Sequence, residues 1–192
     1  MQVKKPNFYS VIIGTELLNG RRKDAHFAFL NQQLLSRGWE QKASFVIADD
    51  TNLMENIFNL IKSDPNSVMF CFGGIGATPD DYTRVVAANV FTNGKMEFHE
   101  EAKNRIINQF KDEAYPHRIN MAHLPINAKL LTNVVNNVAG FYLEDRFFFT
   151  PGFPSMSQAM VIEALDKLYP KSNIEKYRKV MTINASENDL ID

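Results

Sequence analysis

The chain has 192 residues, of which 45% are hydrophobic and 22% are charged, a balance that is typical of globular proteins and excludes intrinsic disorder. Its 21 Lys and Arg against 22 Asp and Glu give a net charge of −1, so no overall field favours nucleic acid or an anionic membrane surface. We therefore expect no nucleic-acid and no membrane partner, and any anionic ligand must be bound locally.

A chain of this length can bury one sizeable core, and we predict one domain over residues 1–170 followed by a polar tail over residues 171–192. Residues 1–9 contain two lysines and a proline but no long apolar run, so we expect no signal peptide. No later stretch is long enough to span a bilayer. Cys71 is the only cysteine, which excludes an intrachain disulfide and a cysteine-based zinc site. These features predict a cytoplasmic protein.

Apolar, strand-like runs alternate with helix-like periodicity through the first half of the chain. Such alternation predicts right-handed βαβ crossovers. The predicted fold class is therefore α/β, a three-layer sandwich with a mostly parallel central sheet and helices on both faces. The predicted strands are 8–13, a second strand that ends over residues 45–48, and 68–72, and the predicted helices are 24–37, 53–61 and 82–90.

The middle of the chain continues with one more helix and then loses its periodicity. Apolar residues four apart predict an amphipathic helix over residues 98–110, supported by an ion pair between Glu101 and Arg105. Residues 114–127 contain two prolines and two histidines without an apolar pattern, which predicts a loop.

The last part of the domain is predicted to be a small β-rich C-terminal segment and a final helix. A tight turn at Glu144-Asp145 joins the last two strands, and a capping box from Ser155 to Gln158 opens the helix. The predicted strands of this segment are 130–135, 140–143 and 146–149.

Three polar loops follow the predicted parallel strands, at residues 14–20, 49–50 and 73–81. In an open parallel sheet, ligands bind beyond the carboxyl ends of the strands, where these loops converge. The third loop has three glycines in four positions, which bring bare backbone N–H groups close to an anion, as phosphate cradles require. It has neither the Gly-Lys-Ser/Thr of a Walker loop nor the third glycine of a Rossmann fingerprint. We predict that this loop binds phosphate.

A purely structural interpretation of the same loop is also open. Thr78 can be the N-cap of the next helix, with Pro79 at position N1 and Asp81 at position N3. A cap needs only Thr78 and one acidic partner, so this interpretation leaves the glycines and the carboxylate of Asp80 unexplained. We therefore favour a role in ligand binding.

Several segments, in order along the chain, are similar to the motifs of a known family. Over about residues 7–168 the chain resembles the MoaB/Mog-type molybdopterin-binding superfamily, in particular the branch that forms the N-terminal domain of CinA. The segments, with the patterns that they resemble, are 14–20 (G-D-E-L-L-x-G), 46–50 (V-x-D-D), 73–84 (G-G-x-G-P-T-x-D-D-x-T-R), 118–125 (N-R-x-Q-A-x-x-P), 136–141 (N-x-x-G-x-A-P-G-F) and 151–154 (P-G-V-P).

The resemblance implies a small-molecule nucleotide or pterin such as molybdopterin as ligand, a divalent metal ion such as Mg²⁺ as cofactor, and a homo-oligomer, dimer or trimer. It implies either hydrolysis of a nucleotide diphosphate such as ADP-ribose or FAD, as in the CinA branch, or adenylyl transfer to molybdopterin, as in the Mog branch. Asp49 and Asp81 match the family's active-site aspartates and are the expected catalytic and metal-binding residues. The expected phosphate- and ligand-binding residues are Gly73, Gly74, Gly76, Thr78, Asp80, Thr83, Glu16, Asp24, Pro151 and Gly152.

The chain departs from the family pattern at several positions around the inferred pocket. Thr15, His26 and Ala77 replace an aspartate, an asparagine and a proline, and the proline that usually follows position 139 is absent. These departures keep a rival hypothesis open, namely a binding module that has retained the fold and lost turnover.

Other candidate residues have structural interpretations. Glu16 and Asp24 can each cap the first crossover helix, and Arg84 can pair with Asp80 at i,i+4 spacing or contact a phosphate. The four histidines show no metal-ligand spacing and are predicted to lie on the surface or in loops. The residues that we predict to be buried in the core are Trp39, Cys71 and residues 147–149.

Overall fold

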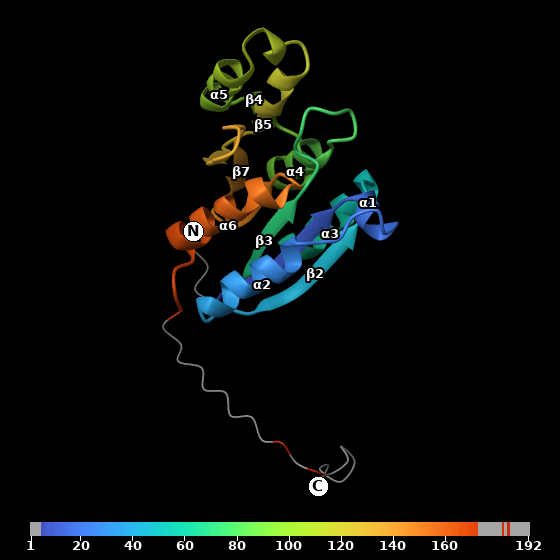
Figure 1. The fold of residues 1–192 in the computed structure, drawn as a ribbon, viewed down its shortest axis with the longest axis vertical. Coiled ribbons are helices and arrows are strands. Elements are labelled where there is room, and N and C mark those ends of the chain that lie inside the picture. The colour runs from blue at the N-terminus through green and yellow to red at the C-terminus, as the bar shows by residue number, and fades with distance from the viewer. Residues whose placement is uncertain (1–4, 173–181, 183, 185–192) are drawn as a thin grey trace.

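The computed structural model of the chain describes residues 5–172, 182 and 184 (Figure 1). Almost all of the predicted tail lies outside these residues, so the tail and the domain boundary at residue 170 stay predictions. A six-stranded sheet with the order β2-β1-β3-β8-β7-β6 forms the centre of the domain. Its strands are β1 (Asn7–Ile13), β2 (Gln41–Ile47), β3 (Ser67–Phe72), β6 (Lys129–Leu131), β7 (Gly140–Leu143) and β8 (Phe147–Thr150).

Four neighbouring strands, β2, β1, β3 and β8, run parallel, and β7 runs antiparallel to both of its neighbours. The central strands β1 and β3 are almost entirely buried, which explains why their sequences are continuous apolar runs rather than alternating patterns. The parallel strands end at Ile47, Ile13, Phe72 and Thr150, so the loops that follow them begin at one edge of the sheet.

Helices cover both faces of the sheet, which confirms the predicted three-layer α/β class. Helices α2 and α6 pack on the face that carries Phe70 and Phe148, and Figure 1 shows them on the same side of the sheet. Helices α3 and α4 pack on the opposite face, which carries Cys71 and Phe149. None of the helices in the described part of the chain is long and apolar enough to cross a bilayer. The covering helices are α2 (His26–Ser36), α3 (Thr51–Ser63), α4 (Thr83–Thr92) and α6 (Pro154–Leu168).

A small lobe follows α4 and lies at the top of Figure 1. The prediction of a structureless loop over residues 114–127 was wrong, because this segment contains two short 3₁₀ helices and a strand. Its elements hold together through contacts with residues far along the chain, such as the pairing of β4 with β5, which local periodicity does not reveal. The lobe consists of β4 (Met96–Phe98), α5 (Glu100–Phe110), η1 (Lys111–Ala114), η2 (Arg118–Ala122) and β5 (His123–Pro125).

The predicted C-terminal strands are present and belong to the central sheet. Glu144 and Asp145 have φ of 54° and 56°, the left-handed pair of a type I′ turn, and they join β7 to β8 as predicted. The strand predicted over residues 130–135 ends at Leu131, because Asn133 turns the chain by donating from its side-chain amide to the carbonyl of Val138 at 2.9 Å.

Two helices differ from the sequence prediction, one in its start and one in being present at all. Helix α6 begins at Pro154, and Ser155 lies inside the helix and is no cap, so the predicted capping box was wrong. Pro154 already has a helical φ and has no N–H of its own to satisfy, and the N–H of Met156 donates to the carbonyl of Phe153 at 2.9 Å, so the helix starts without a side-chain cap. A short helix, α1 (Thr15–Leu18), follows β1 and was not predicted.

Candidate functional site

A cleft of about 470 Å³ opens at the carboxyl edge of the parallel strands. Its volume lies within the range of small-molecule sites. The structure brings all the predicted site residues except Asp24 and Thr83 to this one cleft. The predicted residues that line it are Glu16, Asp49, Gly73, Gly74, Gly76, Thr78, Asp80, Asp81, Pro151 and Gly152.

The glycines of the loop are required by its backbone path. Gly73 and Gly74 have φ of 104° and 68°, which disfavour every other residue. A Cβ atom would lie 2.6 Å from the carbonyl oxygen of Ile13 at the first position and 2.2 Å from Oγ1 of Thr83 at the second. At Gly76 it would lie 2.6 Å from Oδ2 of Asp81. The glycines therefore have a structural cause that the sequence did not reveal.

Two buried side chains hold the carbonyl groups of this loop on its inner side. Thr83 donates its hydroxyl to the carbonyl of Gly73 at 2.9 Å and its backbone N–H to the carbonyl of Gly74 at 3.0 Å. The guanidinium of Arg84 donates to the carbonyls of Ile75 and Gly76. Arg84 is buried, and that burial lowers the pKa of its guanidinium. Neither the predicted ion pair with Asp80 nor a phosphate contact is the role that Arg84 has here.

The N–H groups of the same peptides point the opposite way. In a trans peptide the C=O and N–H bonds are antiparallel, so when Thr83 and Arg84 hold four carbonyls inward, the next four N–H groups point outward. None of these N–H groups has an acceptor among the described residues. We call them the anion cradle: the backbone N–H groups of residues 74–77, on a loop that lines the cleft.

Two aspartates of the cleft each accept hydrogen bonds from a threonine at one of their two carboxylate oxygens. Oδ2 of Asp49 accepts from the N–H and the hydroxyl of Thr15, both at 2.8 Å. Oδ2 of Asp81 accepts from the N–H and the hydroxyl of Thr78, at 2.8 and 2.5 Å. The Oδ1 atoms accept no hydrogen bond from the described part of the chain. Each aspartate is thus oriented by the protein and retains one oxygen for a ligand.

The helix predicted over residues 82–90 is present as α4, but the structural interpretation of Thr78 as its N-cap was wrong. Helix α4 begins only at Thr83, and Tyr82 precedes it without a side-chain cap. Thr78 and Asp81 instead close a turn, in which the N–H of Asp81 donates to the carbonyl of Thr78 at 3.1 Å. The capping residues are present, but the contacts of Thr83 and Arg84 with the glycine loop delay the start of the helix.

The two predicted residues outside the cleft have structural roles. Asp24 precedes the N-cap Ala25 and accepts from the N–H groups of His26 and Phe27 at 2.8 and 3.1 Å, so it satisfies the first N–H groups of α2, in line with the structural interpretation. Thr83 lies buried beneath the glycine loop. Sequence reasoning also missed a lining residue: Arg22 is the only basic side chain among the described residues of the cleft. Its signal was the Arg21-Arg22-Lys23 run between two predicted motifs.

A second cavity of about 250 Å³ adjoins the glycine loop on the side of the small lobe. It shares Ile75, Gly76 and Ala77 with the cleft, and most of its other walls are apolar or aromatic. The guanidinium of Arg118 stacks on the ring of Phe110 in this wall at 4.6 Å from the ring centroid. The remaining lining residues are Met121, Asn133, Asn136, Val138, Pro151, Phe153 and Met156.

The burial of the remaining candidate residues shows their structural roles. Cys71 is fully buried, and burial raises the pKa of its thiol, which confirms a structural role. His26 corrects the prediction of surface or loop histidines, because it is buried and stacked on Phe72 with ring centroids 4.4 Å apart. Phe147 to Phe149 are buried as predicted, and Trp39 packs partly buried against the core. Within the residues that the structure describes, no three His, Cys, Asp or Glu side chains gather closely enough to hold a metal ion.

The chain is thus a three-layer α/β domain with an anion cradle and two oriented carboxylates at the carboxyl edge of its sheet. The model of one family, described as a probable molybdopterin binding domain, matches residues 10–170. The chain belongs to this molybdenum-cofactor biosynthesis family, as a MoaB/Mog-type domain related to CinA.

Relatives and solved structures agree with this assignment. A protein of Pyrococcus horikoshii is 28% identical over 86% of this chain and 70% of its own length. A CinA-like protein of Leptospira biflexa is 30% identical over 96% of this chain, which spans 49% of that protein. CinA of Thermoplasma acidophilum, described as of unknown function, has a TM-score of 0.74 at 24% identity, covering 84% of this chain and 97% of that one. MoaB of Thermus thermophilus has a TM-score of 0.54 at 13% identity, covering 85% and 91%. At these identities the solved structures support the fold.

Proposed function

We propose that the chain binds a phosphate-bearing nucleotide or pterin in the cleft and cleaves a phosphoanhydride with the help of a divalent metal ion. A nucleotide diphosphate such as ADP-ribose or FAD is the proposed substrate class. The family supplies the expectation of a pterin or nucleotide ligand, and the chain's own residues supply the reasons that follow.

The anion cradle is the observation that carries the proposal. Four consecutive N–H groups without a protein acceptor are costly in a folded protein unless water or a ligand satisfies them. The protein fixes them in this orientation through Thr83 and the buried guanidinium of Arg84. The carbonyl groups of this loop are thus held by the protein, while the N–H groups of the cradle have no acceptor among the described residues. Such a set of N–H groups fits the oxygens of an anion such as a phosphate.

The carboxylates of Asp49 and Asp81 fit a metal ion that is bound jointly by the protein and by the phosphate of the ligand. Mg²⁺ is usually bound by one or two carboxylates, water and the phosphate oxygens of the substrate, rather than by a cage of protein groups. Asp49 and Asp81 each retain one oxygen, so the pair fits this pattern without a third acidic side chain. The metal ion would supply charge neutralisation at the phosphate and a more acidic attacking water. Asp81 would orient the phosphate end of the ligand, since Thr78 fixes its carboxylate.

The apolar cavity beside the loop gives room for the ring system of the same ligand. It shares the backbone of residues 75–77 with the cleft, so a ligand can place its phosphate on the cradle and its ring between apolar walls. Apolar walls with a few polar groups are typical of sites for flat organic rings.

A non-catalytic binding module is the second candidate, and one observation favours it. Thr15, which stands where the family pattern has an aspartate, occupies Oδ2 of Asp49 with two hydrogen bonds. The carboxylate of the family pattern is therefore absent beside Asp49, and one oxygen of Asp49 is engaged by Thr15 instead. Adenylyl transfer to molybdopterin is the alternative reaction if turnover is retained.

The deciding experiment is a substrate screen. ADP-ribose, FAD, NAD and ATP, the last with and without molybdopterin, are incubated with Mg²⁺, Mn²⁺ or Co²⁺, and the products are measured by mass spectrometry. Release of AMP from a dinucleotide supports the hydrolase. Adenylylated molybdopterin from ATP supports the transferase, and binding without product supports the binding module.

A further inference from the structure

The cleft has an electrostatic imbalance that the anion cradle alone does not correct. Four carboxylates line it, and Arg22 is the one basic side chain among its described lining residues. An isolated phosphate on the cradle is stabilised by four N–H groups, but a second phosphate beyond the cradle faces mainly acidic side chains. Besides the divalent metal ion that the proposed function places at Asp49 and Asp81, Arg22 is the one cation among the described lining residues that can meet this second phosphate.

Arg22 is held in the cleft by contacts that leave it donors for a ligand. Its Nη2 atom donates to the carbonyl of Gly152 at 3.1 Å, and its Nη1 atom lies 3.6 Å from Oε1 of Glu16. Its guanidinium carbon lies 5.2 Å from the centroid of the Phe153 ring. A guanidinium has five N–H donors in a fork that matches phosphate oxygens, and these contacts use only part of them. The pair with Glu16 is long and solvent-exposed, so a phosphate can replace it.

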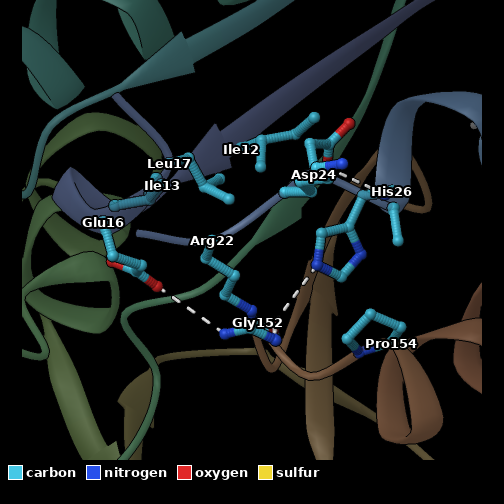
Figure 2. A pocket seen from close by; sticks show the side chains of 11 residues that line it. Ile12, Ile13, Glu16, Leu17, Arg22, Asp24, His26, Gly152 and Pro154 are labelled. Atoms are coloured by element: carbon cyan, nitrogen blue, oxygen red, sulfur yellow. Dashed lines mark hydrogen bonds and ion pairs between the residues drawn. The ribbon is translucent and has the colours of Figure 1, made fainter. Parts of the chain in front are cut away.

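The anchor of Arg22 is itself fixed by a buried histidine. Figure 2 shows both side chains directed at Gly152, Arg22 from the loop before α2 and His26 from the first residue of that helix. Nε2 of His26 lies 3.2 Å from the carbonyl oxygen of Gly152, which can only accept, so this nitrogen carries the proton. The ring is stacked on Phe72, and its Nδ1 atom lies 3.4 Å from the hydroxyl of Ser157.

Gly152 in turn lies against the start of the glycine loop. A Cβ atom on Gly152 would lie 3.3 Å from Cα of Gly73, so the two backbones are in close contact. Gly73 immediately precedes the cradle. The arginine that Gly152 anchors is therefore attached to the same wall of the cleft as the cradle, and one ligand can contact both.

We propose that Arg22 binds the second phosphate of the ligand, so that the cleft selects compounds with two linked phosphates over monophosphates. This inference rests on the proposed function, because it assumes that the first phosphate lies on the cradle. Arg22 exchanges Glu16 for the phosphate and keeps its bond to Gly152, and His26 acts as the positioning residue behind that bond.

The test compares AMP with α,β-methylene-ADP, whose two linked phosphorus groups cannot be hydrolysed between them. Affinities are measured by calorimetry with Mg²⁺ for the parent protein, Arg22→Met and Arg21→Met. Arg22→Met removes the charge and keeps an apolar stem over Phe153, and Arg21→Met is the matched control because Arg21 is exposed and does not line the cleft. We expect Arg22→Met to lower the affinity for α,β-methylene-ADP by about tenfold or more, which is the effect of losing a charged hydrogen bond. The affinity for AMP should fall by less than about threefold.

Three results would overturn the proposal. Equal affinities of Arg22→Met and Arg21→Met for α,β-methylene-ADP would show that Arg22 does not bind the ligand. Equal weakening of AMP and α,β-methylene-ADP would place Arg22 on the first phosphate instead. Both of these leave the proposed function intact, whereas a parent protein that binds neither compound would overturn the proposed function as well.

Discussion

The two edges of the central sheet carry similar polar residues, but those at the amino edge are hydrogen-bonded within the protein and several at the carboxyl edge are not. At the amino edge, Asp64 accepts from the side chains of Asn7, Tyr9 and Lys42 at 2.8, 2.9 and 3.1 Å and from the N–H of Asn66 at 2.9 Å. At the carboxyl edge, four N–H groups and one oxygen of each of two aspartates have no partner in the described part of the chain.

The arginines show the same contrast. Arg146, at the amino edge, donates to the backbone and hydroxyl oxygens of Ser67 and to the carbonyl of Asp64, so it ties strand ends together. Arg22, at the carboxyl edge, retains donors that have no acceptor among the described residues. A site can therefore be distinguished from a structural network even when the residue types are the same. The network satisfies its own polar groups, whereas the site orients polar groups and leaves them unsatisfied.

The largest expected effect is on turnover at the carboxyl edge. Asp49→Asn and Asp81→Asn should each lower turnover by about 10²–10⁴-fold, because an amide is a poor ligand for a hard divalent ion and accepts no proton at neutral pH. Their melting temperatures should change little, since both side chains are partly exposed. Steady-state kinetics with the substrate found in the screen, together with thermal unfolding, measure both.

Asp50→Asn is the matched control for these variants. Asp50 is the neighbour of Asp49, but it caps α3 by accepting from the N–H of Leu53 at 2.8 Å, and it does not line the cleft. Asparagine is an equally good cap, so this variant should keep both turnover and stability. An equal loss of turnover in Asp50→Asn would contradict the assignment of Asp49.

The next effect concerns the support of the cradle. Arg84→Met should lower the free energy of unfolding by about 2–4 kcal/mol, because it leaves the buried carbonyls of Ile75 and Gly76 unpaired. It should also abolish phosphate binding, because the N–H groups lose their orientation. Urea unfolding and calorimetry with pyrophosphate measure the two quantities. A variant that binds pyrophosphate as tightly as the parent would show that the cradle does not depend on Arg84.

The sequence predicted the elements that local pattern determines. The central strands, the helices α2 to α5 and the turn at Glu144-Asp145 follow from apolar periodicity and turn chemistry, and the convergence of the loops follows from the topology of a parallel sheet. The loop at residues 73–81 was placed correctly, with its aspartates and glycines in one cleft.

What the sequence could not predict depends on contacts between distant residues. Helix α4 begins at Thr83 and not directly after Thr78, because Thr83 and Arg84 bind the carbonyls of the glycine loop. Thr78 therefore does not have the capping role that its position suggested. His26 is buried because Phe72 and Gly152 lie beside it, and these are far from it in sequence. The role of the glycines was inferred from the ligand, and the close approach of Ile13 and Thr83 that also requires them is visible only in three dimensions.

A smaller effect is expected at the amino edge. Partial burial alone would raise the pKa of Asp64, but the hydrogen bonds from Asn66, Asn7, Tyr9 and Lys42 lower it from 3.8 to about 2. Since the folded-state pKa is depressed, the carboxylate contributes stability above about pH 4 and loses it as the pH falls towards about 2. Discounted for solvent screening, Asp64→Asn should cost about 1–2 kcal/mol at pH 7.

Unfolding titrations of the parent and of Asp64→Asn between pH 2 and pH 7 check this prediction. The two curves should converge at the acidic end, and turnover of the variant should equal that of the parent at pH 7. Loss of turnover without loss of stability would reverse the roles that we assign to the two edges.

The smallest effect is expected from removing one donor of the cradle. Ala77→Pro deletes a single N–H group, and the family pattern has proline at this position, so the backbone tolerates it. The affinity for pyrophosphate should fall by about 3- to 10-fold, the value of one hydrogen bond, with no loss of stability because this N–H has no protein acceptor. Ala77→Ser retains the N–H and should bind as the parent does. An unchanged affinity of Ala77→Pro would remove Ala77 from the cradle.

In the proposed site, the N–H groups of residues 74–77 bind an anion. A ¹H–¹⁵N correlation spectrum of the protein, titrated with pyrophosphate, observes each of these groups directly. We expect the amide signals of Gly74, Ile75, Gly76 and Ala77 to shift together along one saturating binding curve, while that of Asn66 at the amino edge does not move. Shifts that leave these four signals in place, or that concentrate at the amino edge, would contradict it.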